Sequence, residues 1–208
     1  MTKPLRTGDG IRRGGAQYAA IHVALARASA HELARAGYGD FAPAAVAARA
    51  GVSTRTAFRH YETKLALAVA GIQSLPTYAG WLAATGPDDP FAERLRRGLR
   101  TGAQHDELVA HITATCLSFR ETQPELLRAL KRHVLTPRQR EIERFLDEGK
   151  RAGVFRADVA APAFAAADLG IFMLAALGQF RLGRGETRAA RMFAQLWPML
   201  AADAHLGD

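Results

Sequence analysis

Residues 37–67 decide the fold of this chain and read GYGDFAPAAVAARAGVSTRTAFRHYETKLAL. Pro43 suits the first turn of a short helix, because its missing N–H would have no partner there. Gly51 then supplies a tight turn that other residues make less easily. Ser53 or Thr54 caps the second short helix that follows. The stretch therefore predicts a helix-turn-helix.

The second of these helices has the composition of a DNA-reading helix. Ala47 is small enough for the two helices to approach closely, and Val52 and Phe58 are expected to fill the small core between them. The outward face then holds hydroxyl, guanidinium and imidazole groups, which reach base edges and phosphates in protein–DNA complexes. These outward residues are Thr54, Arg55, Thr56, Arg59 and His60.

The segment resembles the DNA-binding domain of TetR-family transcriptional regulators from Leu25 to about Val69. The family pattern has a first helix ending in Gly-aromatic, an Ile-Ala-x-x-Ala-Gly-Val-Ser segment, a tyrosine-rich recognition helix and a Lys soon after it. Here these elements read Gly37-Tyr38, Val46-Ala47-Ala48-Arg49-Ala50-Gly51-Val52-Ser53, Thr56-Ala57-Phe58-Arg59-His60-Tyr61 and Thr63-Lys64. Two positions depart from it: Ala42 stands where a Thr or Ser cap is common, and Glu62 places an acid beside the expected phosphate contacts.

The resemblance implies a DNA-binding site formed by Ser53, Thr54, Arg55, Thr56, Arg59, His60, Tyr61, Thr63 and Lys64. Lys64, the Thr63 hydroxyl and nearby backbone N–H groups form a phosphate site. Arg55 and Arg59 are candidates for guanine or phosphate, and the two threonines of this helix for phosphate or a thymine methyl. Ser53 is expected to cap the helix, and His60 to meet phosphate. Tyr61 is expected to donate its hydroxyl to phosphate, to pack its ring against the first helix, or to do both.

Positive charge is concentrated at the start of the chain. The 208 residues carry a formal net charge of +8, and residues 1–64 hold +6 of it, with ten Lys and Arg against four acids. This asymmetry is typical of a nucleic-acid reader joined to a near-neutral body, and a solubilising face is the other interpretation. Residues 1–14 are expected to form a flexible basic arm. Its Arg12 and Arg13 either contact DNA, in the minor groove or along the backbone, or remain disordered, with Arg6 and Lys3 further out.

The remaining sequence predicts an all-α protein. Ala, Leu, Arg and Glu dominate, and no run alternates apolar and polar residues over the length of a strand. Helices are expected over about 16–36, 43–50, 54–61, 64–75, 90–99, 105–122, 124–152, 161–182 and 186–204, with a kink or break at Thr136–Pro137. We divide the chain into a DNA-binding domain at residues 1–75 and a larger helical ligand-binding and dimerisation domain at residues 76–208.

The larger domain has the features of a sensor and a dimer core. Residues 168–182 are apolar on two sides, whereas a surface helix needs one apolar stripe. The resemblance implies that the last two helices pair with their copies as a four-helix bundle in a homodimer. An effector pocket would lie inside this domain, and an apolar or aromatic compound fits it best. Its candidate lining residues are Trp81, Phe91, Cys116, Phe119, Asp168, Phe172 and Met173. Asp168, an acid in an apolar helix, needs a partner such as an Arg or a ligand donor.

Enzymes, metal proteins and membrane proteins find no support in the sequence. Ser29, His31 and Glu32 are neighbours on one helix rather than a catalytic triad. Cys116 is the single cysteine, which suits a reducing cytosol and excludes a cysteine-rich zinc site. No secretory signal is recognisable at the start. The longest apolar stretch, residues 159–178, carries a central Asp that a membrane span would not tolerate cheaply.

The sequence therefore predicts a cytoplasmic, ligand-responsive transcriptional regulator that works without a cofactor, a metal or enzymatic activity. Its partners are a double-stranded DNA operator, a small-molecule effector and a second copy of the chain. A repressor released from a palindromic operator by its effector is the expected form. The alternative is a helical small-molecule-binding dimer with weak or non-specific DNA binding.

Overall fold

The computed structural model describes the backbone of residues 8–176 and 185–205, and the side chains of residues 15–105, 107–170 and 186–205. Within these ranges the regular elements are helices, apart from one isolated antiparallel bridge between Phe155 and Ala201. The predicted all-α class is confirmed. Two compact units form, one from residues 1–75 with 115–129 and one from 76–114 with 130–208. The functional division at residue 75 stays a prediction.

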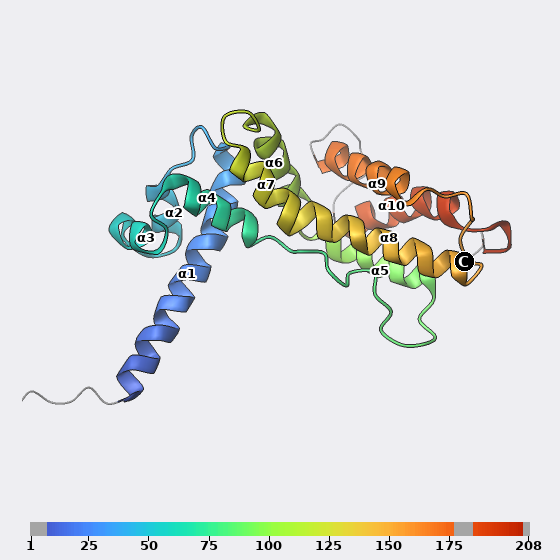
Figure 1. Cartoon of the computed structure of the whole chain (residues 1–208), viewed down its shortest axis with the longest axis horizontal. Coiled ribbons are helices and arrows are strands. Elements are labelled where there is room, and N and C mark those ends of the chain that lie inside the picture. The colour runs from blue at the N-terminus through green and yellow to red at the C-terminus, as the bar shows by residue number, and fades with distance from the viewer. Residues whose placement is uncertain (1–7, 177–184, 206–208) are drawn as a thin grey trace, which may run out of the picture. The chain divides into compact units, whose positions relative to one another are not determined.

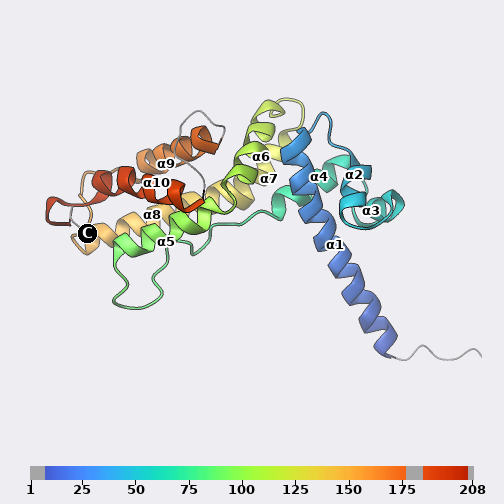
Figure 2. The same cartoon turned by 180° about the vertical axis from the view of Figure 1, so that it is seen from behind.

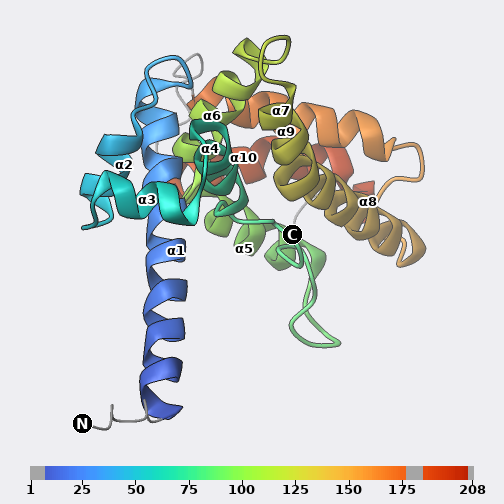
Figure 3. The same ribbon diagram turned by 60° about the vertical axis from the view of Figure 1, so that its left-hand side comes forward.

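Helices α1 to α4 make up most of the first unit. Figures 1 and 3 show α2, α3 and α4 gathered around the C-terminal half of the long α1. The bounds are α1 (Gly8–Ala36), α2 (Pro43–Arg49), α3 (Thr54–His60) and α4 (Lys64–Gln73). Their shared core consists of fully buried aliphatic side chains from α1, α2 and α4, namely Leu25, Leu33, Val46, Leu67 and Ile72. Burying these side chains holds the short helix α2 against α1 and α4.

Helices α1 and α4 approach each other closely where both carry small residues. The Ser29 hydroxyl donates a hydrogen bond to the Leu67 carbonyl at 2.6 Å. Gly71 lies opposite, and a Cβ added to it would stand 2.7 Å from the backbone nitrogen of Ala30. The absence of a side chain at Gly71 is therefore what permits this contact.

The second unit contains α5 (Phe91–Ala103), α8 (Thr136–Arg151), α9 (Ala161–Ala176), α10 (Gly185–Leu200) and a short 3-10 turn at Asp203–His205. Helices α6 (Asp106–Ser118) and α7 (Pro124–Leu130) contribute residues to both units. In the second unit α10 packs along α5, and α9 along α8 (Figure 2). An aromatic cluster fills its core, with ring centroids 5.1–5.8 Å apart. The members of this cluster are Phe91, Phe145, Phe155 and Trp197.

The start of α1 differs from the prediction. Residues 8–14 were expected in a flexible arm but belong to α1, while residues 1–7 lie outside the described residues. Glycines in this stretch each disfavour a helix by about 1 kcal/mol relative to alanine. Extending an existing helix nevertheless needs no new nucleation step. The helix formed by the alanine-rich segment that follows can therefore extend toward the N-terminus through residues 8–14.

The predicted break at Thr136–Pro137 takes the form of a π-helical turn. This turn spans Lys131–Leu135 and joins α7 directly to α8. Pro137 has no N–H, and in a regular α-helix its ring would clash with the carbonyl four residues earlier. The wider turn relieves that clash without ending the helix.

Several other helix ends also differ from the predicted ones. Helix α5 continues to Ala103 and α6 already ends at Ser118. Helix α10 ends at Leu200. The end of α9 predicted at residue 182 lies outside the described residues, which reach Ala176 in this helix. Among the described helices, none combines the length and the apolar character needed to cross a bilayer.

Candidate DNA-binding surface and effector pocket

Capping hydrogen bonds fix both ends of the segment that carries α3. The Ser53 hydroxyl accepts from the Thr56 N–H at 3.1 Å, so the expected cap forms. At the start of α4, the Thr63 hydroxyl accepts from the Ala66 N–H at 3.0 Å. Gly51, between α2 and α3, has a φ of +71°, which glycine adopts without the strain that a side chain would bring. Caps and turn together give α3 a defined orientation on the unit.

The last residue of α3, His60, faces α1. Its ring centroid lies 4.0 Å from that of Tyr18 and 5.8 Å from that of His22. The side chain is buried, and neither ring nitrogen has a hydrogen-bond partner among the described residues. Burial, followed by the charges of His22 and Arg59, lowers the pKa of His60. The outward position expected for His60 is therefore wrong. His60 shares the inner face of α3 with Ala57, which lies three residues earlier.

The outer face of α3 carries Thr54, Arg55 and Arg59, all exposed as predicted. Neither arginine forms an ion pair within the part of the chain that the structure describes. Thr56 is half-buried, and its hydroxyl lies 3.0 Å from that of Ser53.

Phe58 also belongs to this outer face, since 40% of its surface is exposed. The expectation that it fills the core between α2 and α3 is wrong, because Ala57 occupies the inward position of that turn. The exposed ring adds an apolar group to the face that also carries Arg55. The clue in the sequence was the helical period, which cannot place Phe58 and Ala57 on the same face.

Tyr61 and Lys64 make contacts inside the first unit. The Tyr61 hydroxyl donates to the backbone carbonyl of His22 at 3.1 Å, and its ring stacks on the His22 ring at 4.4 Å. Burial raises the pKa of Tyr61 to about 12. Of the two roles predicted for Tyr61, the structure shows the packing of its ring against α1. The Lys64 ammonium donates to the Gly39 carbonyl at 3.0 Å and lies 5.0 Å over the Tyr38 ring.

The N-terminal arginines add to the basic character of this unit. Arg12 and Arg13 lie in α1, but their side chains are outside the described residues, as are Lys3 and Arg6 altogether. Their contact with DNA stays a prediction.

Ser29 and Glu32 hold the fold together. The Ser29 hydroxyl is committed to Leu67, as described above. Glu32 is buried and receives two hydrogen bonds from Arg35, at 2.8 and 3.0 Å, which lower the pKa of Glu32. Where the structure describes side chains, it contains no group of three or more His, Cys, Asp or Glu that could hold a metal ion.

The buried Asp168 in the second unit has an arginine partner. Arg138 donates from Nε and Nη2 to Asp168 Oδ2 at 3.1 and 2.8 Å, and both residues are buried. The Arg138 guanidinium also lies 4.7 Å over the ring of Tyr78 and 4.6 Å over that of Trp81. Of the two partners considered for Asp168, an Arg is the one present. A cavity of about 350 Å³ between α8 and α9 has Arg138 in its wall.

The residues predicted to line one effector pocket are divided between the two units. Cys116 and Phe119 belong to the first unit, where Phe119 packs edge-on against Tyr38 at 5.5 Å. Burial raises the pKa of the Cys116 thiol to about 12. In the second unit, Trp81 and Asp168 surround Arg138, while Phe91 lines a separate cavity of about 470 Å³. The side chains of Phe172 and Met173 lie outside the described residues.

These features define a helix-turn-helix unit joined to a helical body. No protein-family model matches the sequence, and no curated protein matches it. The solved structure of a TetR-family regulator from Rhodococcus sp. is 15% identical, with a TM-score of 0.66 over 88% of this chain and 100% of that one. A fatty acid degradation regulator, FadR from Bacillus halodurans, is 17% identical, with a TM-score of 0.62 over 85% and 94%.

A third structure comes from work on the control of antibiotic production by bacterial hormones. It is 21% identical, with a TM-score of 0.62 over 87% of this chain and 97% of that one. The chain therefore has the fold of the TetR-family transcriptional regulators, and the resemblance seen in residues 25–69 is confirmed at the level of the fold.

Proposed function

We propose that this protein is a DNA-binding transcriptional regulator of the TetR type, in which α3 reads the major groove. One observation carries the proposal: α3 is fixed by caps and by its buried face, and it presents Thr54, Arg55 and Arg59 to solvent, where neither arginine has an ion-pair partner among the described residues. Exposed arginines on a rigid helix suit bidentate contacts to guanine, and the hydroxyl suits phosphate or a thymine methyl.

The start of α4 is proposed as the phosphate anchor beside this helix. Lys64 and the N–H groups of the first turn place positive charge there, where the helix dipole also favours an anion. The contact of Lys64 with Gly39 holds the ammonium near this position.

We further propose that the protein acts as a homodimer through α9 and α10. Helix α9 is apolar on all sides, yet Pro162, Ala163 and Ala166 are exposed on the single chain, and Met199 on α10 is 46% exposed. A helix that is apolar all round is normally covered. Two copies also supply two recognition helices, which can bind half-sites one turn of DNA apart and so favour a palindromic operator.

Release from DNA by a small-molecule effector completes the proposal. An effector that binds the helical body in one conformation better than in another shifts the dimer away from the spacing that the operator requires. The protein then acts as a repressor in the absence of its effector.

Selection of bound fragments from genomic DNA, followed by fluorescence anisotropy on the enriched sequence, tests the DNA-binding part. We expect a palindromic site whose affinity falls with salt. Arg59→Ala should weaken binding to this site by about 1–3 kcal/mol if Arg59 reads a base. Arg140→Ala on α8 removes the same charge outside the first unit and should leave affinity unchanged. Equal binding to all sequences would overturn the proposal.

The second candidate function is a small-molecule-binding dimer with non-specific DNA binding. Glu62 favours it, because this exposed acid lies next to Thr63 at the expected phosphate anchor. In the same assay it predicts affinity that depends on salt but not on sequence. Glu62→Gln should then strengthen binding to every DNA fragment by a similar factor.

A further inference from the structure

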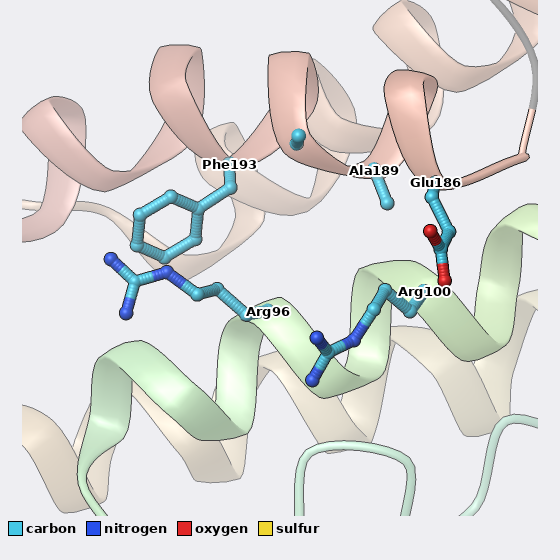
Figure 4. A pocket seen from close by; sticks show the side chains of 6 residues that line it. Arg96, Arg100, Glu186, Ala189 and Phe193 are labelled. Carbon is cyan, nitrogen blue, oxygen red and sulfur yellow. The ribbon is translucent and has the colours of Figure 1, made fainter.

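A groove between α5 and α10 has the size and lining of a small-molecule site. Its volume is about 310 Å³, and ligand pockets commonly span about 300–1,000 Å³. Figure 4 shows side chains from both helices facing it. The lining residues are Arg96 and Arg100 from α5 with Glu186, Ala189, Ala190 and Phe193 from α10. Both helices belong to the second unit, so the described lining residues all lie within it.

One end of the groove is a fixed cation–aromatic pair. The Arg96 guanidinium lies 4.1 Å over the Phe193 ring, as Figure 4 shows, and its Nη1 is 2.7 Å from the Glu93 carboxylate. Stacking and ion pairing together hold this arginine in one place and balance its charge. Arg96 and Phe193 therefore form a preordered flat wall.

Arg100 supplies the second guanidinium of the groove. It follows Arg96 by one helical turn, on the same face of α5. Its side chain is exposed, and it forms no ion pair with the residues that the structure describes. A guanidinium of this kind offers a fork of donors that matches a carboxylate in two parallel hydrogen bonds.

Helix α10 supplies the apolar floor. Ala189 and Ala190 are too small to fill the space above α5, and Phe193 continues the same surface one turn later. Glu186 hangs from α10 on the side of Arg100 (Figure 4). Its carboxylate disfavours a second negative charge on a ligand held there.

We propose that this groove binds a flat aromatic monocarboxylate. The carboxylate pairs with Arg100, and the ring packs on the alanines beside Phe193, where apolar contact and aromatic packing both favour it. This inference rests on the proposed function in one respect: the bound compound would be the effector that releases DNA. Because it spans α5 and α10, such a ligand favours the conformations in which these helices keep their present spacing.

Titration calorimetry of the full chain with 2-naphthoate tests the site, and 2-naphthalenemethanol is the matched uncharged probe. We expect saturable binding of one 2-naphthoate per chain and binding of the alcohol that is weaker by about tenfold or more. Arg100→Gln should weaken 2-naphthoate by a similar factor. Ala190→Trp should block it by filling the groove. Arg140→Gln, which removes an exposed arginine from α8, should leave binding unchanged.

Three outcomes would overturn the site: no saturable binding of 2-naphthoate, equal binding of the alcohol, or equal binding by the Arg100→Gln protein. Thermal unfolding of each variant shows whether it is folded, and Arg100→Gln should unfold like the parent because its side chain is exposed. The titration contains no DNA, so it reports on the groove even if the chain proves not to be a regulator. Anisotropy of operator DNA with added 2-naphthoate then tests the effector role separately.

Discussion

Gly71→Ala should break the close contact between α1 and α4. An alanine Cβ at this position would lie 2.7 Å from the Ala30 nitrogen, 2.7 Å from the Ser29 hydroxyl and 2.9 Å from the Ser29 carbonyl carbon. Two of these three atoms belong to the backbone of α1, so a rotamer change cannot relieve the clash. The two helices have to separate, which also stretches the hydrogen bond between Ser29 and Leu67.

The expected cost follows from two opposing effects. Overpacking of a well-packed contact costs about 1–3 kcal/mol, and the backbone clash places Gly71→Ala toward the upper part of this range. Alanine regains up to about 1 kcal/mol of helix propensity, less here because Gly71 lies in the last turn of α4. We therefore expect a net loss of about 2 kcal/mol, which lowers the melting temperature by about 4–8 °C.

Urea unfolding followed by far-ultraviolet circular dichroism measures this loss, and hydrogen exchange locates it. Exchange should speed up in the amides of α4 and in the facing part of α1. Gly15→Ala is the matched control, because Gly15 is in α1 and a Cβ there meets no atom within 4 Å. This control should leave the protein unchanged or stabilise it by up to about 1 kcal/mol. The reasoning fails if Gly71→Ala is as stable as the parent protein, or if both variants lose the same stability.

Three further predictions concern buried polar groups. The pKa of His60 is lowered by burial, so the folded state binds fewer protons than the unfolded state and the free energy of unfolding should decrease as pH falls below about 6.5. His60→Phe keeps the stack on Tyr18 and should flatten that pH dependence in urea unfolding; an unchanged slope would contradict the prediction. Asp168→Asn removes the negative charge that pairs with the buried Arg138 guanidinium and should cost about 3–5 kcal/mol. Replacing both residues by apolar ones should recover most of this loss, as chemical unfolding can show. The Cys116 thiol is buried, and its pKa is raised to about 12. It should therefore resist a thiol reagent at pH near 7 in the native protein and react fully in urea. Rapid labelling of the native protein would argue against this burial.

The helix-turn-helix was predictable because its signals are local. Pro43, Gly51 and Ser53 each act on the residues next to them, and α2 and α3 begin where these residues predict. The inner face of α3 was not predictable in the same way. A helix of two turns is too short for its apolar pattern to fix an orientation, and the partner that buries His60 is Tyr18, far away in the sequence.

The predicted effector pocket shows a second limit of prediction from the sequence. An isolated Asp in an apolar helix predicts that Asp168 needs a partner, but not that Arg138, thirty residues away, provides it. Large apolar residues predict a core without distinguishing its interior from the wall of a cavity. The groove at Arg100 was missed for the opposite reason, because a charged residue on a helix surface carries no signal until the neighbouring helix is placed.

The π-helical turn before α8 shifts the buried positions of that helix by about one residue. Counted from the buried Leu130 in steps of 3.6, an uninterrupted α-helix would turn positions near 137, 144 and 148 inward. The buried residues of α8 are instead centred about one position later, namely Arg138, Glu141, Ile142, Phe145, Leu146 and Gly149. A chain with one residue fewer in the segment 131–135 would rotate this stripe by about 100° and turn Phe145 out of the aromatic cluster. The length of that segment therefore decides which face of α8 meets the aromatic cluster.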